Sequence, residues 1–350
     1  MRAVLVAIVM LGCACGRLRF DPTADPLDAE SSVHSSLHLD RVDPGEQMFD
    51  FPLMVVLDDT RADRTRLQAD ASDLAFYDTS NVRLRHEIEQ VGAPGGAPLI
   101  AWVRIPLYED LSTAIEVRYG GDPLAPTASP WPDTMRAVWH FPDCSLGDSI
   151  MGHDGTGTAV APTTGAIGTA CDFTGASSIE VADSPSLEFP ALTATGWILQ
   201  RTRGSPYQSL VTRAYQNMGL DDFYLGAHSG LAYAGVTSTF PAQIESFAGA
   251  FALGTWAHLA VTIDATTMQL YLDGVLEDQQ TPPGSPNHSA HSIFLGADCN
   301  YIGPGCPDDD FLDGSIDEVR LDSVVRSPAW IAIDHFSQLD QLITYGPIEH

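Results

Sequence analysis

The chain contains no lysine. Its 17 basic residues are all arginine and stand against 46 aspartates and glutamates, which gives a formal net charge of −29 over 350 residues. A surface with this excess of negative charge repels phosphate backbones, so we do not expect a nucleic-acid partner. Such a balance is typical of soluble exported proteins, and it can also attract divalent cations.

Long apolar runs are scarce as well. No segment of the chain approaches the roughly 18 apolar residues that a helix needs to cross a bilayer. The N-terminus has a basic Arg2, a short apolar run that ends at Leu11, and then Gly12-Cys13. A basic start before so short an apolar run is typical of a signal peptide, which we assign to residues 1–12.

The end of this segment reads Met10-Leu11-Gly12-Cys13 and resembles the bacterial lipobox, in which the cysteine is lipidated and becomes the mature N-terminus. The resemblance implies a lipid on Cys13. Because Ala14 rather than Asp follows, it also implies sorting to the outer membrane. The alternatives are lipidation at Cys15 and an ordinary signal peptide with incidental cysteines. Residues 13–43 are polar, and we interpret them as a flexible tether.

Paired Cys-x-x-Cys motifs are absent, which argues against a zinc site built on cysteines. Four cysteines follow the two near the N-terminus, and an even number in an exported chain suggests disulfide bonds. Four cysteines allow three pairings. The local spacing favours Cys144 with Cys171 and Cys299 with Cys306.

Catalytic motifs are incomplete. The run His86–Gln90 begins like a zincin motif but has Gln90 where the second histidine is required, and no Gly-x-Ser-x-Gly elbow is present. Glu87 and Glu89 have the spacing of a retaining-glycosidase pair. They share a strand face with two arginines, so we interpret them as cross-strand ion pairs on a solvated face. We therefore predict that the protein is not an enzyme.

The first half of the chain shows no helical period. Apolar and polar residues alternate instead in short segments such as 82–89 and 115–119, which polar turns separate. This pattern predicts an antiparallel β-sandwich at residues 44–122. Residues 123–132 hold four prolines and are the expected linker to a second domain.

Four motifs follow one another between about Gln47 and Gly121. They read Asp-Leu-Ala-Phe-Tyr-Asp, Leu-Arg-His-Glu-Ile-Glu, Ala-Trp-Val-Arg-Ile-Pro and Ile-Glu-Val-Arg-Tyr-Gly-Gly. This order resembles the bacterial domain of unknown function 2341. The resemblance implies a domain that often precedes a laminin-G-like domain, but it implies no activity.

The most informative segment is 254–326. One strand parity from Ala257 to Ile263 is apolar, which predicts a strand with a buried face. Asp273-Gly274 between strand residues predicts a two-residue hairpin. The order Trp-x-His-x-x-Val, Tyr-x-Asp-Gly, Gly-x-Ile-Asp-Glu-Val-Arg resembles the laminin-G-like jelly roll, a concanavalin A-like β-sandwich. We place this domain at 133–345, with a short tail helix possible from Pro328 to Gln341.

This second resemblance implies a Ca²⁺ ion at the sandwich edge, held by carboxylates of the opening segment and the last strand. Asp148 and Asp317 are the matching candidates. Asp317 shares parity with Val319 and Leu321, so we expect its carboxylate to face the core, where it needs hydrogen bonds, an ion pair or a metal. The alternative is that Asp317 fixes a neighbouring loop through backbone N–H groups.

These patterns and resemblances together predict an all-β, surface-anchored lipoprotein with two antiparallel β-sandwich domains. Its lectin-like second domain is expected to recognise extracellular glycans or surface proteins without catalysis. Aromatic residues expected to be exposed near the jelly-roll loops are candidate ligand contacts, with core packing as the alternative: Tyr215, Phe223, Tyr224 and Tyr233. The other functional hypotheses are a structural or adhesion component of the envelope and a glycan-active enzyme.

The lipobox yields the first testable prediction. Cys13→Ala removes the thiol that would carry the lipid, so the variant should move from the membrane fraction to the soluble fraction after cell lysis. Cys15→Ala is the matched control and should stay with the membranes. A Cys13→Ala variant that still fractionates with membranes would refute lipidation at this position.

Overall fold

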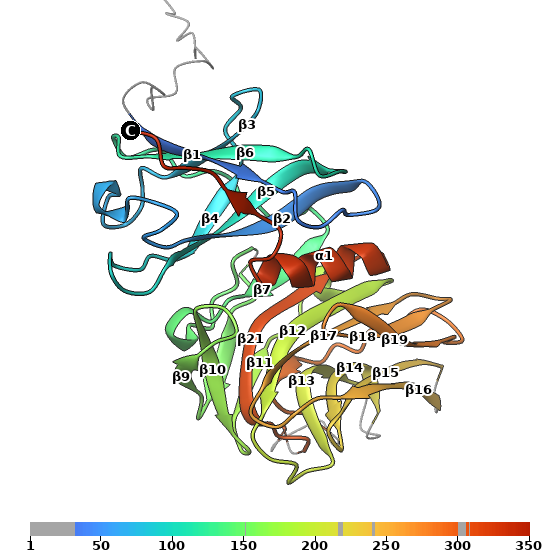
Figure 1. The fold of residues 1–350 in the computed structure, drawn as a ribbon. Helices are drawn as coiled ribbons and strands as arrows, with labels where there is room; N and C mark the ends of the chain where they lie inside the picture. The colour runs from blue at the N-terminus through green and yellow to red at the C-terminus, as the bar shows by residue number, and fades with distance from the viewer. Residues whose placement is uncertain (1–31, 151, 216–219, 240–241, 300–305, 308) are drawn as a thin grey trace, which may run out of the picture.

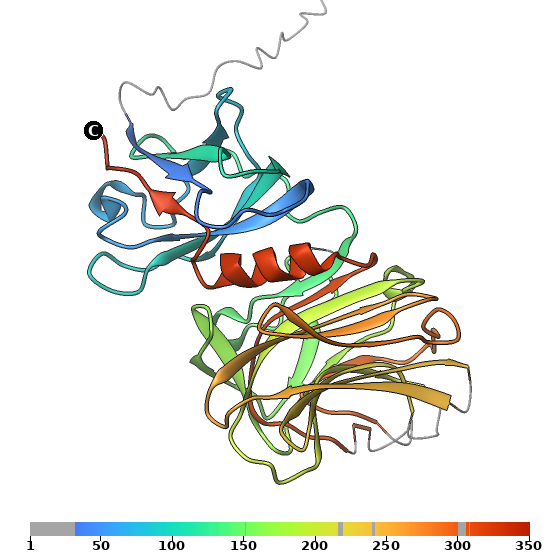
Figure 2. The same ribbon diagram turned by 45° about the vertical axis from the view of Figure 1, so that its right-hand side comes forward.

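The computed structural model describes residues 32–150, 152–215, 220–239, 242–299, 306–307 and 309–350. These residues form two β-sandwich domains with a helix between them, as Figures 1 and 2 show from two sides. The predicted all-β fold class is confirmed. The signal peptide and Cys13 lie outside the described residues. Within the described part of the chain, no helix has the length and apolar character that a membrane span requires.

The first domain packs a four-stranded sheet, in the order β22-β1-β6-β3, against a three-stranded sheet, β2-β5-β4. Their apolar faces form one core. The strands are β1 (Val33–His38), β2 (Met48–Leu57), β3 (Ala75–Asp78), β4 (His86–Gln90), β5 (Leu99–Tyr108), β6 (Ala114–Tyr119) and β22 (Thr344–Tyr345), with a short 3₁₀ turn, η1 (Arg64–Arg66).

The second domain is a larger sandwich. Its eight-stranded sheet has the order β19-β18-β17-β12-β21-β10-β9, with β7 also paired to β21, and its seven-stranded sheet has the order β16-β15-β14-β13-β20-β11-β8. The strands are β7 (Met135–Trp139), β8 (Gly155–Thr158), β9 (Ala161–Thr164), β10 (Thr169–Thr174), β11 (Ser178–Val181), β12 (Leu192–Gln200), β13 (Tyr207–Ala214), β14 (Asp221–His228), β15 (Leu231–Thr239), β16 (Ala242–Ala250), β17 (Trp256–Ile263), β18 (Met268–Leu272), β19 (Val275–Gln280), β20 (Ile293–Leu295) and β21 (Asp313–Asp322). Two 3₁₀ turns, η2 (Pro142–Cys144) and η3 (Pro185–Leu187), lie in its loops.

The strand and hairpin predicted near residue 260 are both present. On β17 the predicted apolar parity, from Ala257 to Ile263, lies in the core between the two sheets. Leu272 pairs with Val275 across the turn. The turn residues Asp273 and Gly274 have φ values of 50° and 76°, the positive values that a two-residue hairpin of this kind requires.

A β-bulge in β21 reverses the predicted orientation of Asp317. Ile316, Val319 and Leu321 all point into the sandwich core, although the first two are three positions apart, where regular alternation requires an even number. The register against β12 shifts at this point, and Glu318 has a φ of 51°. The extra residue of a bulge resets the alternation of side chains. Asp317 is therefore buried as predicted, but it faces away from the core of its own domain.

The helix α1 (Pro328–Gln338) falls within the predicted tail helix and connects the second domain back to the first. Ser327 caps it by accepting a hydrogen bond from the Trp330 amide, and Pro328 occupies the first turn, where no amide donor is needed. Several of its apolar side chains, among them Trp330 and Ile331, belong to the core of the first domain.

Two predicted boundaries are wrong. Residues 33–38 of the expected tether form β1, which pairs along its whole length with β6. At the other end, β22 pairs with β1, so the last residues of the expected second domain belong to the first. Both strands are short, and their partners lie far away in the sequence. Local sequence patterns do not indicate such pairing.

The structure joins Cys144 to Cys171 and Cys299 to Cys306, the pairing that the spacing favours, with Cα–Cα distances of 4.7 and 5.4 Å. The first bond connects η2 to β10. The second closes a loop that follows β20.

The return of the C-terminus predicts a long-range effect on stability. Ile343 is 1% exposed and lies in the core of the first domain, so Ile343→Ala should lower the free energy of unfolding by about 2–4 kcal/mol, as measured by urea denaturation. Leu339→Ala is the matched control, because Leu339 is 40% exposed and should lose far less. Equal losses in the two variants would contradict the placement of this segment.

Candidate functional site

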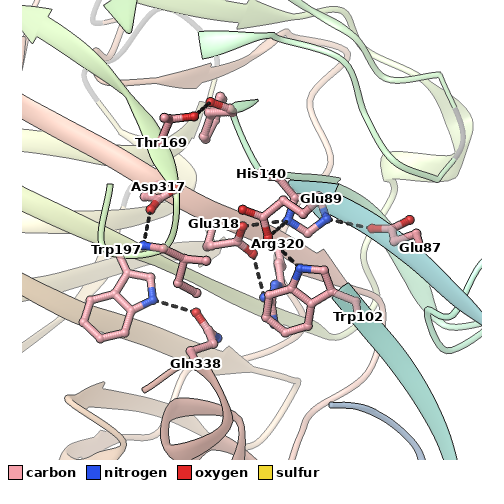
Figure 3. A network of polar contacts seen from close by, with 12 residues as sticks. Glu87, Glu89, Trp102, His140, Thr169, Trp197, Asp317, Glu318, Arg320 and Gln338 are labelled. Carbon is pink, nitrogen blue, oxygen red and sulfur yellow. Dashed lines mark hydrogen bonds and ion pairs between the residues drawn. The ribbon is translucent and has the colours of Figure 1, made fainter. Parts of the chain in front are cut away.

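A cluster of charged side chains lies between the two domains (Figure 3). Glu87 and Glu89 extend from β4 of the first domain, while His140, Glu318 and Arg320 belong to the second. His140 directly follows β7, which pairs with β21, and the bulge in β21 turns Glu318 and Arg320 toward the same side. We call these five residues the interdomain cluster.

His140 is the centre of the interdomain cluster. Its Nε2 lies 2.8 Å from Glu87 Oε1. Its Nδ1 lies 2.6 Å from Glu318 Oε1 and 3.6 Å from Glu89 Oε2. The second oxygen of Glu318 accepts a hydrogen bond of 2.7 Å from Arg320 Nη2. One imidazole ring therefore faces carboxylates from both domains.

Two indole rings enclose the cluster and contribute polar contacts. Trp102 Nε1 donates to Glu89 Oε2 at 2.8 Å, and Trp131 Nε1 donates to Glu87 Oε1 at 3.0 Å. The guanidinium of Arg320 lies 4.2 Å from the centroid of the Trp102 ring, a cation–π contact. The side chains of Glu89 and Glu318 are only 2% and 0% exposed. Water is thus replaced by rings and fixed donors, which strengthens every charge interaction in the cluster.

Burial shifts the protonation of these groups. It raises the pKa of Glu89 to about 8, and the nearby charge of Glu318 acts in the same direction. Burial alone would lower the pKa of His140, but the charges and hydrogen bonds of Glu318 and Glu87 raise it well above its usual value. These shifts favour the charged form of the imidazole and the neutral form of the Glu89 carboxyl group. Burial likewise raises the pKa of Asp317 well above its usual range.

The donor atoms of Glu89, His140 and Glu318 all lie within 4.8 Å of one another, so this group could hold a metal ion. It is the only group of three or more such donors among the described residues. The sequence patterns do not indicate this group, because His140 belongs to none of the motifs described above and Glu89 is assigned to a solvated face. That assignment is wrong for Glu89, because the polar face of β4 packs against the second domain.

The two carboxylates predicted to bind calcium contact backbone amides. Asp148 Oδ1 accepts from Val138 and Ile150, and its Oδ2 accepts from His153. Asp317 Oδ2 accepts from Ile167 at 2.9 Å. Neither aspartate joins a group of three metal donors in the described part of the chain. The contact of Asp317 is the loop-fixing role given above as the alternative, and a calcium site at these residues stays a prediction.

The predicted exposure of the aromatic ligand contacts is wrong for three of four residues. Phe223 lies in the sandwich core, and Tyr224 and Tyr233, on the other face of the sheet, are also 1% exposed. These two rings pack against each other, with centroids 5.1 Å apart, and both pack against the ring of Tyr207. A ring packed in this way cannot stack on a sugar. Tyr215 is half-buried.

An open pocket of about 350 Å³ lies elsewhere in the second domain. It includes Asp313, the first residue of β21. The other end of this strand lies beside α1 (Figure 1), where Arg326 pairs with Asp322 and stacks on the Trp330 ring. We therefore call the pocket at Asp313 the distal pocket. Its polar lining includes the side chains of Thr174, Thr202, Ser205, Gln208, Asp309, Asp310 and Asp313, and Phe311 adds an aromatic ring.

Comparison with known proteins identifies the class of the second domain. Residues 173–332 match the family described as the Concanavalin A-like lectin/glucanases superfamily, so this domain is a concanavalin A-like jelly roll. A comparison with curated proteins finds no match.

Several solved structures are similar to part of this chain at low identity. Domain 4 of AbnA, a GH43 extracellular arabinanase from Geobacillus stearothermophilus, is 20% identical, with 57% of this chain and 97% of that chain covered and a TM-score of 0.45. The binding domain of Paraclostridial Mosquitocidal Protein 1 is 15% identical, with 59% and 52% covered and a TM-score of 0.46. The match to the botulinum neurotoxin DC binding domain, in complex with rat synaptotagmin II, has the same coverage and TM-score at 14% identity. This chain thus spans about half of each toxin domain, and TM-scores this low carry no argument about function.

The charge network predicts unequal roles for two arginines. Arg320 pairs with Glu318 and Asp334 at 3% side-chain exposure, and Arg201 pairs with Asp172 and Asp313 at 38%. Removing a buried partner leaves uncompensated charge, so Arg320→Met should lower the free energy of unfolding by about 3–5 kcal/mol. Arg201→Met, the matched control, should cost at most about 1 kcal/mol. Chemical denaturation of both variants measures the difference, and similar losses would contradict the role given to Arg320.

Proposed function

We propose that the second domain binds glycans without catalysis, through the distal pocket. The observation that carries this proposal is the lining of that pocket, where hydroxyl, amide and carboxylate groups surround a volume of about 350 Å³. Sugars present many hydroxyl groups, each able to donate and accept hydrogen bonds. The volume is within the range of small-ligand sites, and the half-buried Phe311 offers an apolar surface for a sugar ring.

The charge of the pocket selects among glycans. Asp309, Asp310 and Asp313 contribute three carboxylates, of which Asp313 pairs with Arg201, and the whole chain carries a net charge of −29. Uronic acids and sulfated sugars would meet repulsion at this site, particularly at low salt. Carboxylates instead accept hydrogen bonds strongly from neutral hydroxyls and from ammonium groups. Neutral or amino sugars are therefore the proposed ligand class.

Non-catalytic binding is favoured over hydrolysis by the placement of the paired glutamates. Glycosidases need two carboxylates on either side of an accessible glycosidic bond. Glu87 and Glu89 have a suitable spacing along β4, but Glu89 is 2% exposed and both accept hydrogen bonds from buried indole groups. A polysaccharide cannot reach this position while the domains are docked. Together with the proposed lipid on Cys13, this supports a binding protein displayed at the outer membrane.

A glycan array on the same protein also tests two alternatives to glycan binding. If the distal pocket binds a surface protein, or if the protein has an envelope role without any glycan, no glycan on the array should bind. The array is run in Ca²⁺ and again in EDTA, because the resemblance implies a calcium ion in this domain. Binding that disappears in EDTA and returns when Ca²⁺, but not Zn²⁺, is added back would support the calcium part of the proposal, and binding in both conditions would remove it.

The distal pocket predicts the effect of a blocking substitution. Ser205 lines the pocket, so Ser205→Trp should fill it and weaken binding of a neutral oligosaccharide from the array by at least about tenfold, measured by calorimetry. Ser80→Trp, on an exposed turn of the first domain, is the matched control and should bind as the wild type does. Unchanged binding by Ser205→Trp, in a variant that melts like the wild type, would exclude the distal pocket.

A further inference from the structure

The interdomain cluster has the donor arrangement of a metal site. Nδ1 of His140 faces two carboxylate oxygens, 2.6 Å away on Glu318 and 3.6 Å away on Glu89 (Figure 3). Ligand atoms around a tetrahedral Zn²⁺ stand about 3.3–3.5 Å apart, as bond lengths of about 2.0–2.2 Å require. The three side chains therefore need only small rotations to surround an ion.

Each of these donors is already oriented by a further contact. Nε2 of His140 is engaged by Glu87, which leaves Nδ1 directed at the other two carboxylates. Trp102 donates to Glu89, and Arg320 donates to Glu318. Metal-binding histidines almost always direct their second nitrogen to a carboxylate or carbonyl, and ligating carboxylates are themselves hydrogen-bonded. The outer contacts of a metal site are thus complete here.

Charge balance also favours a cation at this place. Three carboxylates, from Glu87, Glu89 and Glu318, surround the single imidazole. The other cation of the cluster, Arg320, divides its charge between Glu318 and Asp334, to which it donates a bond of 2.9 Å. Buried carboxylates in excess of cations are costly unless a metal ion or protons neutralise them.

We propose that Glu89, His140 and Glu318 bind one divalent transition-metal ion, Zn²⁺ above all, and that this ion clamps the two domains together. One imidazole nitrogen and two carboxylate oxygens suit Zn²⁺, whereas Ca²⁺ prefers six to eight oxygen ligands. The ion takes the place of two protons, the one that His140 Nδ1 shares with Glu318 and the one that burial favours on Glu89, and both protons leave to solvent. Because Glu89 comes from β4 and the other two ligands come from the second domain, metal binding and domain docking favour each other.

This proposal is independent of glycan binding, since it is measured on the metal alone. Full-length protein is stripped with a chelator, dialysed against Zn²⁺, Mn²⁺ or Ca²⁺, and analysed for bound metal by mass spectrometry. We expect one equivalent of Zn²⁺ and no stoichiometric Ca²⁺. Zn²⁺ at 100 times its Kd should favour the folded state about 100-fold and raise the melting temperature. It should also slow proteolytic cleavage in the linker 123–132.

Three variants locate the ion. Glu89→Gln removes one ligand and should abolish stoichiometric Zn²⁺ binding. Glu87→Gln changes only the group that orients His140 and should weaken binding about 10–100-fold. Glu180→Gln carries the same charge change at an exposed position of β11 and should bind as the wild type does. Melting in EDTA shows whether each variant is folded.

Two results would overturn the proposal. One is a folded Glu89→Gln variant that binds Zn²⁺ like the wild type, which would mean that the ion sits on other histidines. The other comes from wild-type crystals soaked in Zn²⁺, which do not depend on any variant. An anomalous difference map without a peak between Glu89, His140 and Glu318 would exclude the site.

Discussion

The docking of the two domains depends on how charge is buried between them. His140 and Arg320 have side chains that are 4% and 3% exposed, and removing such cations from water costs several kcal/mol each unless partners compensate. Glu318 compensates both, with one oxygen directed to each. Glu87 of the first domain then pairs with the remaining nitrogen of the imidazole. A separated second domain would expose this cluster, so the charges are best satisfied when the domains are together.

Chain connectivity reinforces this constraint. The first domain begins with β1 and is completed by β22, after the whole second domain has intervened. The helix α1 contributes to the core of the first domain, and on its other side Gln338 accepts a hydrogen bond of 2.6 Å from Trp197 Nε1 on β12. Moving the domains apart would therefore disturb a core, a sheet edge and a buried polar contact at once. Such shared contacts make cooperative unfolding of the two domains the natural expectation.

The sequence predicts well those features that depend on residues close together in the chain. The alternation on β17, the Asp273-Gly274 turn and the tail helix all follow from residues close together in the chain. The orientation of Asp317 cannot be predicted in this way. It depends on a bulge in which Glu318 has a positive φ, and no glycine in the sequence signals that conformation. The β1–β22 pair escapes prediction for a different reason, since its partners lie at opposite ends of the chain.

The site is harder to predict than the fold because its chemistry depends on what covers each strand face. Glu87 and Glu89 alternate with apolar residues in the way that solvated carboxylates do, and only the second domain makes Glu89 a buried group. The same holds for Tyr224, which is 1% exposed because its ring packs against Tyr207 and Tyr233 on the outer face of the sheet. Alternation distinguishes two faces of a strand, but it does not say which face meets water.

The strand β21 connects the distal pocket to the interdomain cluster. Asp313 lines the distal pocket, while Glu318 and Arg320 hold the interdomain cluster on the same strand. Glu318 is five positions after Asp313 in the strand, which corresponds to a distance of about 17 Å at about 3.3 Å per residue. Because β21 is hydrogen-bonded to β10, β12 and β7, the strand is held rigidly, and its two ends keep a fixed relative position. Fixing Glu318 against the first domain therefore also fixes the direction in which the distal pocket faces. A pocket held in one orientation loses less entropy when it binds an extended ligand.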